Sequence, residues 1–190
     1  AIFECRRLHK KSKRFFFWCK SIFLASNLSN WLSRELEDSK SKIWHGEQLP
    51  KEFEIGDFDA LIIDEAQDLV HLDIVKDLIL KFYKANKSIR LFGDFDFQNL
   101  YESKENLINW FRANKILTSH SRLSINCRNT IQIGEKIRNI ANFDDSEFSL
   151  SSTQGEPLTI IHSVKENRLH EEINNCIDNW VSKGYPEPGV

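Results

Sequence analysis

The feature that most constrains the fold is an unbroken apolar run, Ala60 to Ile63, that ends in two adjacent carboxylates, Asp64 and Glu65. A short, partly β-branched run of this kind is typical of a strand buried on both faces, as in parallel sheets. Open α/β sheets bind their ligands at the carboxyl ends of such strands. Because neighbouring acids repel each other, the pair indicates a site for a cation or a reacting group. The alternative interpretation is a solvated strand end.

The periodicity of apolar residues alternates along the chain between strand-like and helix-like segments. We expect strands at 15–19, 59–64, 88–92, 122–127 and 158–161, and helices at 25–36, 72–84, 104–113, 130–140 and 163–182. Residues 38–58 and 142–156 are expected to form loops, the first with a short helix. This alternation predicts an α/β fold with a mainly parallel sheet, and a change of domain near residues 115–125.

The overall charge gives no global attraction to nucleic acid, because the formal net charge of the 190 residues is -2. Residues 4–14 form a local basic segment, in which Glu4 is the single acid. Two interpretations of this segment stay open. It is either a solvated lead-in to the first buried strand or a contact for nucleic-acid phosphates.

Cysteine usage and hydropathy favour a cytoplasmic protein. The four cysteines are far apart and form no CxxC pair, which argues against a zinc site or a disulfide framework. No apolar run approaches the roughly 18 residues of a membrane span. The chain contains no methionine, so we expect it to be part of a longer protein. Removal of an initiator methionine before Ala1 is the alternative.

Several motifs follow one another in an order that resembles a known family. The string Asp64-Glu65-Ala66-Gln67-Asp68 has the form of a Walker B motif, and it resembles motif II of the UvrD/Rep branch of superfamily one DNA helicases. The segment 91–101 resembles motif III, with one additional residue between Gly93 and Gln98. The triplet 126–128 resembles the Asn-Tyr-Arg of the second motor domain, with Cys127 replacing the aromatic residue. The segment 16–21 resembles motif Ia.

The resemblance implies a RecA-like P-loop NTPase fold with ATP and Mg²⁺ as cofactors. Residues 1–118 would be the later part of the first RecA-like domain, and 119–190 the beginning of the second. Asp64 would hold Mg²⁺ and Glu65 would polarise the attacking water. Gln98 would lie near the γ-phosphate, and Arg128 would act as an arginine finger across the interdomain cleft.

The same resemblance implies contacts with single-stranded DNA. Lys20 and Ser21 would contact phosphates, and Asp94 and Tyr101 would belong to the segment that links the nucleotide site to the DNA, where an aromatic ring can stack on a base. Each assignment has a plainer alternative. Gln98 could be a surface loop residue, Tyr101 a core aromatic, and Arg128 an ordinary cation at the start of a helix.

The phosphate-binding part of such a motor is missing from this sequence. None of its seven glycines begins a Gly-x4-Gly-Lys-Ser/Thr loop. The resemblance therefore implies an ATP-dependent DNA helicase or translocase whose remaining parts lie elsewhere, and we expect the isolated chain to be inactive. A non-catalytic helicase-like scaffold that binds nucleic acid or protein is the alternative, which Cys127 and the lengthened motif III favour. An accessory domain of a nuclease is a further alternative, although no nuclease motif occurs.

Overall fold

A computed structural model describes residues 1–36, 41–95, 101, 103–121, 125–126, 130–141, 149–150, 154 and 166–184. The chain forms two compact units, Ala1–Ser119 and His120–Val190. The candidate site residues that the structure describes all belong to the first unit. Among the described residues, no helix combines the length and the apolar character needed to cross a membrane.

The first unit is built on a four-stranded sheet in which every pair of neighbouring strands is parallel. Its strands are β1 (Phe15–Cys19), β2 (Lys42–His45), β3 (Ala60–Ile63) and β4 (Ser88–Leu91), in the order β2-β1-β3-β4. Every residue of the two central strands, β1 and β3, is buried, whereas the edge strands are partly exposed. This burial confirms the predicted α/β fold and the doubly buried strand before Asp64.

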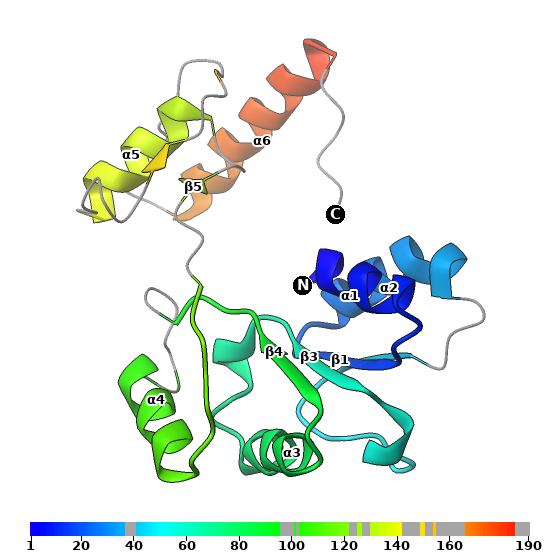
Figure 1. The fold of residues 1–190 in the computed structure, drawn as a ribbon. Coiled ribbons are helices and arrows are strands. Elements are labelled where there is room, and N and C mark those ends of the chain that lie inside the picture. The colour runs from blue at the N-terminus through cyan, green and yellow to red at the C-terminus, as the bar shows by residue number, and fades with distance from the viewer. Residues whose placement is uncertain are drawn as a thin grey trace. The chain divides into compact units, whose positions relative to one another are not determined.

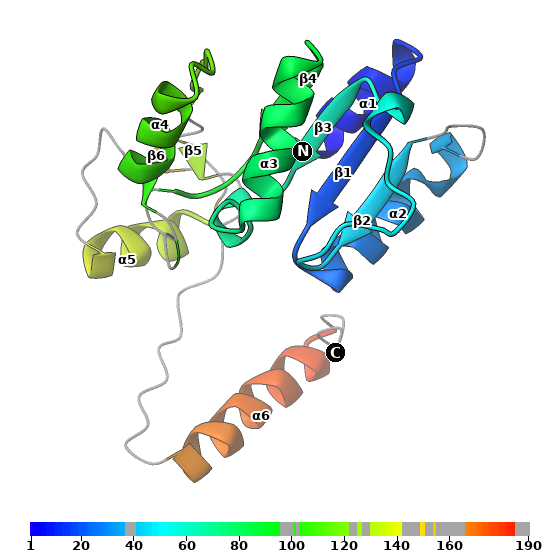
Figure 2. The same ribbon diagram turned by 90° about the horizontal axis from the view of Figure 1, so that it is seen from below.

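Helices cover both faces of this sheet (Figures 1 and 2). One face packs against α1 (Ile2–Lys10) and α2 (Ile22–Leu36), through alternate residues such as Phe15 and Phe17. The other face packs against α3 (Asp73–Lys84) and α4 (Lys104–Ala113), through Phe16 and Trp18. The alternation follows from the pleat, because successive side chains of a strand point to opposite faces. Two apolar cores therefore enclose the strands.

The order of the strands places a topological switch point between β1 and β3. From β1 the chain passes through α2 to β2 at one edge, and then returns past β1 to β3 and β4 on the other side. In open α/β sheets, ligands bind beside the carboxyl ends of the strands at such a point. Lys20 follows β1 there, and Asp64 follows β3.

One prediction about local structure was wrong in this unit, and one helix was not predicted. Residues within the basic segment 4–14 form most of α1, whose inner face carries Cys5 and Leu8. The expected loop 38–58 contains the edge strand β2, together with the short helix η1 (Ile55–Asp57). The predicted helix 25–36 begins earlier, at Ile22. The helices expected at 72–84 and 104–113 and the strand at 88–92 are confirmed to within a residue.

In the second unit, the described elements are β5 (Ile125–Asn126), α5 (Ile131–Ala141), β6 (Ser149–Leu150) and α6 (Glu166–Ser182). Strands β5 and β6 pair in parallel. Strand β6 lies within the segment 142–156 that was expected to be a loop, so that expectation was wrong there. The predicted strand 158–161 and the proposed helix start at 163–165 lie outside the described residues.

Candidate functional site

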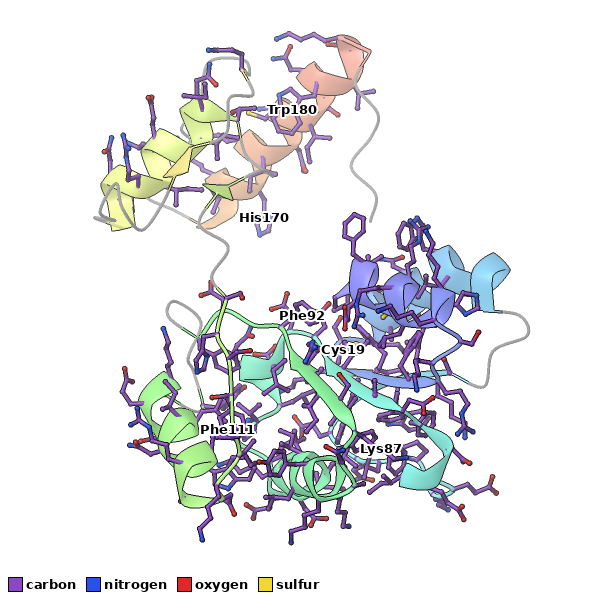
Figure 3. All side chains as sticks on the ribbon, in the orientation of Figure 1. Cys19, Lys87, Phe92, Phe111, His170 and Trp180 are labelled. Carbon is purple, nitrogen blue, oxygen red and sulfur yellow. The ribbon has the colours of Figure 1, made fainter. Side chains whose placement is uncertain are left out.

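The site lies where strands β1, β3 and β4 end together. Hydrogen bonds continue the sheet beyond the strands, since Asp64 N–H donates to Trp18 O at 3.0 Å and Ala66 N–H donates to Phe92 O at 2.8 Å. Figure 3 labels Cys19, the last residue of β1, and Phe92, which follows β4, near each other, with Lys87 toward the opposite end of the strands. The residues after each strand are therefore held by the sheet itself.

Asp64 is a carboxylate in an environment that disfavours its charge. Burial raises the pKa of the Asp64 carboxyl above its ordinary value, and the negative charge of Glu65 raises it further. The amino group of Ala1, at the start of α1, and the backbone N–H of Glu65 oppose this rise. Asp64 is thus a partly desolvated acid, and a nearby cation would favour its charged form.

Glu65 has a strained backbone, with φ 48° and ψ 48° in the left-handed region. Non-glycine residues adopt this conformation at a cost of roughly 1 kcal/mol, and they are found at turns, at helix ends and at functional sites. The conformation ends β3 sharply and starts the short helix η2 (Ala66–Asp68). The Glu65 side chain is exposed and accepts a hydrogen bond from the side-chain amide of Gln67, at 2.8 Å.

Gln67 connects the ends of β3 and β4. Its side chain is 1% exposed. Besides donating to Glu65, it accepts a hydrogen bond from the backbone N–H of Asp94 through Oε1, at 3.2 Å. A Cβ atom at Gly93 would lie 2.6 Å from that same Oε1 and 3.2 Å from the backbone nitrogen of Ala66. The glycine of the Gly-Asp pair is therefore required by the approach of Gln67.

A second cluster lies beside this one and combines a cation with aromatic rings. The Nζ atom of Lys20 lies 5.0 Å from the centre of the Tyr101 ring and 3.0 Å from Glu47 Oε1. The ring of Tyr101 stacks on His71, with centroids 4.5 Å apart. Tyr101 is 54% exposed, so its interpretation as a core aromatic was wrong. Its exposed ring and the nearby ammonium group resemble the surfaces on which nucleic-acid bases stack.

Ser21 has a local structural role that the sequence did not indicate. Its hydroxyl oxygen accepts a hydrogen bond from the backbone N–H of Leu24, at 3.3 Å. This bond satisfies one of the unpaired donors at the start of α2. The predicted phosphate contact of Ser21 is untested and stays a prediction.

The structure brings six of the predicted site residues to one edge: Lys20, Ser21, Asp64, Glu65, Asp94 and Tyr101. Gln98, Cys127 and Arg128 lie outside the described residues, so their predicted roles stay predictions. Sequence reasoning missed Gln67, His71 and Glu47 as members of the site. The one available signal was that Gln67 belongs to the five-residue string that carries the resemblance to motif II.

The donor set fits Mg²⁺ held jointly with a phosphate ligand. Within the described part of the chain, no three His, Cys, Asp or Glu side chains are close enough together to hold a metal. Magnesium commonly takes only one or two protein carboxylates, with water and substrate phosphates as its other ligands. Asp64, with Glu65 next to it, matches this requirement, whereas a metal held by protein alone would need a larger set.

Two surface hollows, of about 430 and 460 Å³, lie elsewhere in the first unit and share Pro50. The first is lined by residues of the segment 49–55 and of α3, and the second by residues of β2 and the segment 50–52. Neither includes Asp64 or Glu65. The candidate site therefore lies at the strand ends, where the predicted acids are, and not in either hollow.

Comparison with known proteins adds no further evidence, since no protein-family model, no curated protein and no solved structure gives a significant match to the chain.

Proposed function

We propose that this chain is part of an ATP-dependent DNA helicase or translocase with a RecA-like P-loop NTPase fold. The observation that carries the proposal is the position of Asp64 and Glu65, directly after a doubly buried parallel strand at the switch point of the sheet. In phosphoryl transfer, proteins act mainly by positioning groups and neutralising charge. An acid for Mg²⁺ and an acid for the attacking water, adjacent in sequence, supply two of the required groups.

The electrostatics at the start of α1 support the same proposal. The amino group of Ala1 lowers the pKa of Asp64, so the start of α1 lies near the acid pair. Helix amino ends bind phosphate groups through their free N–H donors. A phosphate-binding loop in the intact protein would meet Asp64 if it joined the chain at this end of α1.

The cluster of Lys20 and Tyr101 supports single-stranded DNA as the nucleic acid along which the protein would move. Bases can stack on an exposed aromatic ring in any sequence, and a neighbouring ammonium can neutralise backbone phosphates. ATP hydrolysis near Asp64 and DNA binding near Tyr101 would then occur at one edge of the same sheet.

The decisive experiment compares ATP hydrolysis by the intact protein with hydrolysis by residues 1–190 alone. We expect DNA-stimulated hydrolysis in the intact protein, a loss of at least about 100-fold in Glu65→Gln, and no turnover by the isolated chain. Glu105→Gln, which changes an exposed acid in the first turn of α4, serves as the control. DNA binding without any turnover in the intact protein would support the non-catalytic scaffold instead. Turnover by the isolated chain that is lost in Glu65→Gln would contradict the proposal.

A further inference from the structure

We infer that Gln67 is a positioning residue that fixes the carboxylate of Glu65 and the start of the segment after β4 through a single side-chain amide. A catalytic role of Gln67 rests on the proposed function, whereas its two hydrogen bonds can be tested without it. The amide nitrogen donates to Glu65 Oε2 at 2.8 Å, and the amide oxygen accepts from Asp94 N–H at 3.2 Å. The two ends of one rigid planar group thus set the positions of two different segments.

The chemistry of the site selects glutamine. One end of the side chain must donate, because it meets a carboxylate, and the other must accept, because it meets a backbone N–H. A glutamate at this position could accept from Asp94 but would repel Glu65. A methionine would fill the same volume with neither bond, and an asparagine is too short to span both partners.

The surroundings restrict how Gln67 can move. Its side chain is almost fully buried. The backbone of Phe92 is also held in place, because its carbonyl accepts from Ala66 N–H and its N–H donates to Ile63 O at 2.9 Å. Glu65 is held in its left-handed conformation just before η2. A buried amide with both ends bonded is costly to displace, because each buried donor or acceptor left without a partner costs roughly 1–3 kcal/mol of stability.

A change in the direction of the Glu65 carboxylate therefore changes the environment of Asp94. When that carboxylate turns toward a nucleotide or its water, it withdraws an acceptor from Gln67, whose other end holds Asp94. The segment that begins at Asp94 continues to Tyr101, the ring stacked on His71 beside Lys20. Gln67 thus connects the acid that would act on water to the start of the segment that leads to Tyr101.

Two variants separate the two bonds. Gln67→Met removes both, whereas Gln67→Glu keeps an acceptor for Asp94 N–H and removes the donor to Glu65. In the 190-residue chain, we expect hydrogen exchange of the Asp94 amide to become about tenfold faster in Gln67→Met and to be little changed in Gln67→Glu. Gln48→Met and Gln48→Glu, at an exposed glutamine, are the matched controls. Unchanged exchange at Asp94 in folded Gln67→Met would overturn the inference.

The catalytic part is tested in the intact protein by separating kcat from KM. Both variants should lower the DNA-stimulated kcat, by as much as about 100-fold, while KM for ATP stays nearly constant. A kcat equal to wild type in both variants would refute the positioning role. If the wild-type protein hydrolyses no ATP, the proposed function fails, and the exchange of Asp94 still decides the structural part.

Discussion

The ring of Tyr101 stacks on the imidazole of His71 at 4.5 Å between centroids, with their planes 23° apart. His71 lies three residues after the end of η2, in the segment that follows β3, whereas Tyr101 lies in the segment that follows β4. The stack therefore joins the loops of two neighbouring strands. The Nδ1 atom of His71 is buried and has no hydrogen-bond partner. An imidazole whose polar atom is unsatisfied contributes here mainly as a flat support for the tyrosine ring.

Tyr101→Ala should weaken the binding of single-stranded DNA by about tenfold, because stacking on one aromatic ring contributes about 1–3 kcal/mol per base. His71→Ala should weaken binding by a smaller factor, since Tyr101 loses its support, whereas His71→Phe should preserve binding because it keeps a flat ring. Fluorescence anisotropy of a labelled oligothymidine measures all three.

Phe3→Ala is the control for this series, because Phe3 is exposed on α1 and is not part of the cluster. Equal affinities of wild type and Tyr101→Ala would show that the exposed ring does not bind DNA. Equal losses in Tyr101→Ala and Phe3→Ala would show that binding does not depend on this cluster.

The part of the fold that sequence could predict is the part in which burial follows a strong local pattern. The apolar run at Ala60 and the helical spacing of Leu78 and Phe82 each specify an element without reference to the rest of the chain. Helix α1 was missed because its basic outer face dominates the composition, while only Cys5 and Leu8 are buried. Strand β2 was missed because an edge strand with two exposed and two half-buried residues has little apolar signal.

From the sequence, the only site residues that could be predicted were those whose role follows from their position directly after a strand. Asp64 and Glu65 are of this kind. Gln67 and His71 act through partners on the next strand's loop, and those partners are known only once β4 is placed beside β3. The short motifs therefore indicate the acids, whereas the hydrogen bonds that position them require the sheet topology.

Asp64→Asn should stabilise the first unit at neutral pH by no more than about 1 kcal/mol, because solvent partly screens this carboxylate and replacing a functional group often raises stability. The pKa of Asp64 is raised in the folded state, so its ionised form is less favourable there than in the unfolded chain. The carboxyl contributes stability only when protonated, below its ordinary pKa of 3.8, and this contribution is lost as the pH rises through the folded value. Urea unfolding at pH 7 and at pH 4 measures the difference between the variant and wild type.

Asp77→Asn is the control for this substitution, because Asp77 is an exposed partner of Lys81 on α3 and its loss should cost no more than about 0.5 kcal/mol. The stability gained by Asp64→Asn over wild type should be smaller at pH 4 than at pH 7. A variant that is less stable than wild type at pH 7 would show that Asp64 is needed for folding rather than for a ligand.

Gly93→Ala should destabilise the first unit by about 1–3 kcal/mol, the usual cost of forcing an additional methyl group into a packed site. The new Cβ would lie 2.6 Å from Gln67 Oε1 and 3.0 Å from Cε2 of Phe95. Gly56→Ala is a matched control, since a Cβ at Gly56 meets no atom within 4 Å. Thermal unfolding compares the two, and Gly93→Ala combined with Gln67→Ala should cost less than the sum of the single changes. Strict additivity would show that Gly93 and Gln67 do not interact.

The buried thiol of Cys5 predicts a specific loss of stability at alkaline pH. Burial raises the pKa of Cys5 from its ordinary 9.0 to about 12, with the charge of Asp64 also raising it. The folded chain therefore keeps a proton that the unfolded chain releases above pH 9. The stability linked to this proton is fully present below pH 9 and is lost as the pH rises toward 12.

The free energy of unfolding between pH 9 and pH 10.5 should accordingly fall less steeply in Cys5→Ala than in wild type. The two slopes can differ by at most about 1.4 kcal/mol per pH unit, the value for one proton. Other groups titrate in the same range, but they do so in both proteins, so the difference between the slopes isolates Cys5. Cys176→Ala, at a half-exposed cysteine of α6, should leave the slope unchanged. Identical slopes for wild type and Cys5→Ala would mean that the thiol is not buried as the packing of α1 against β1 requires.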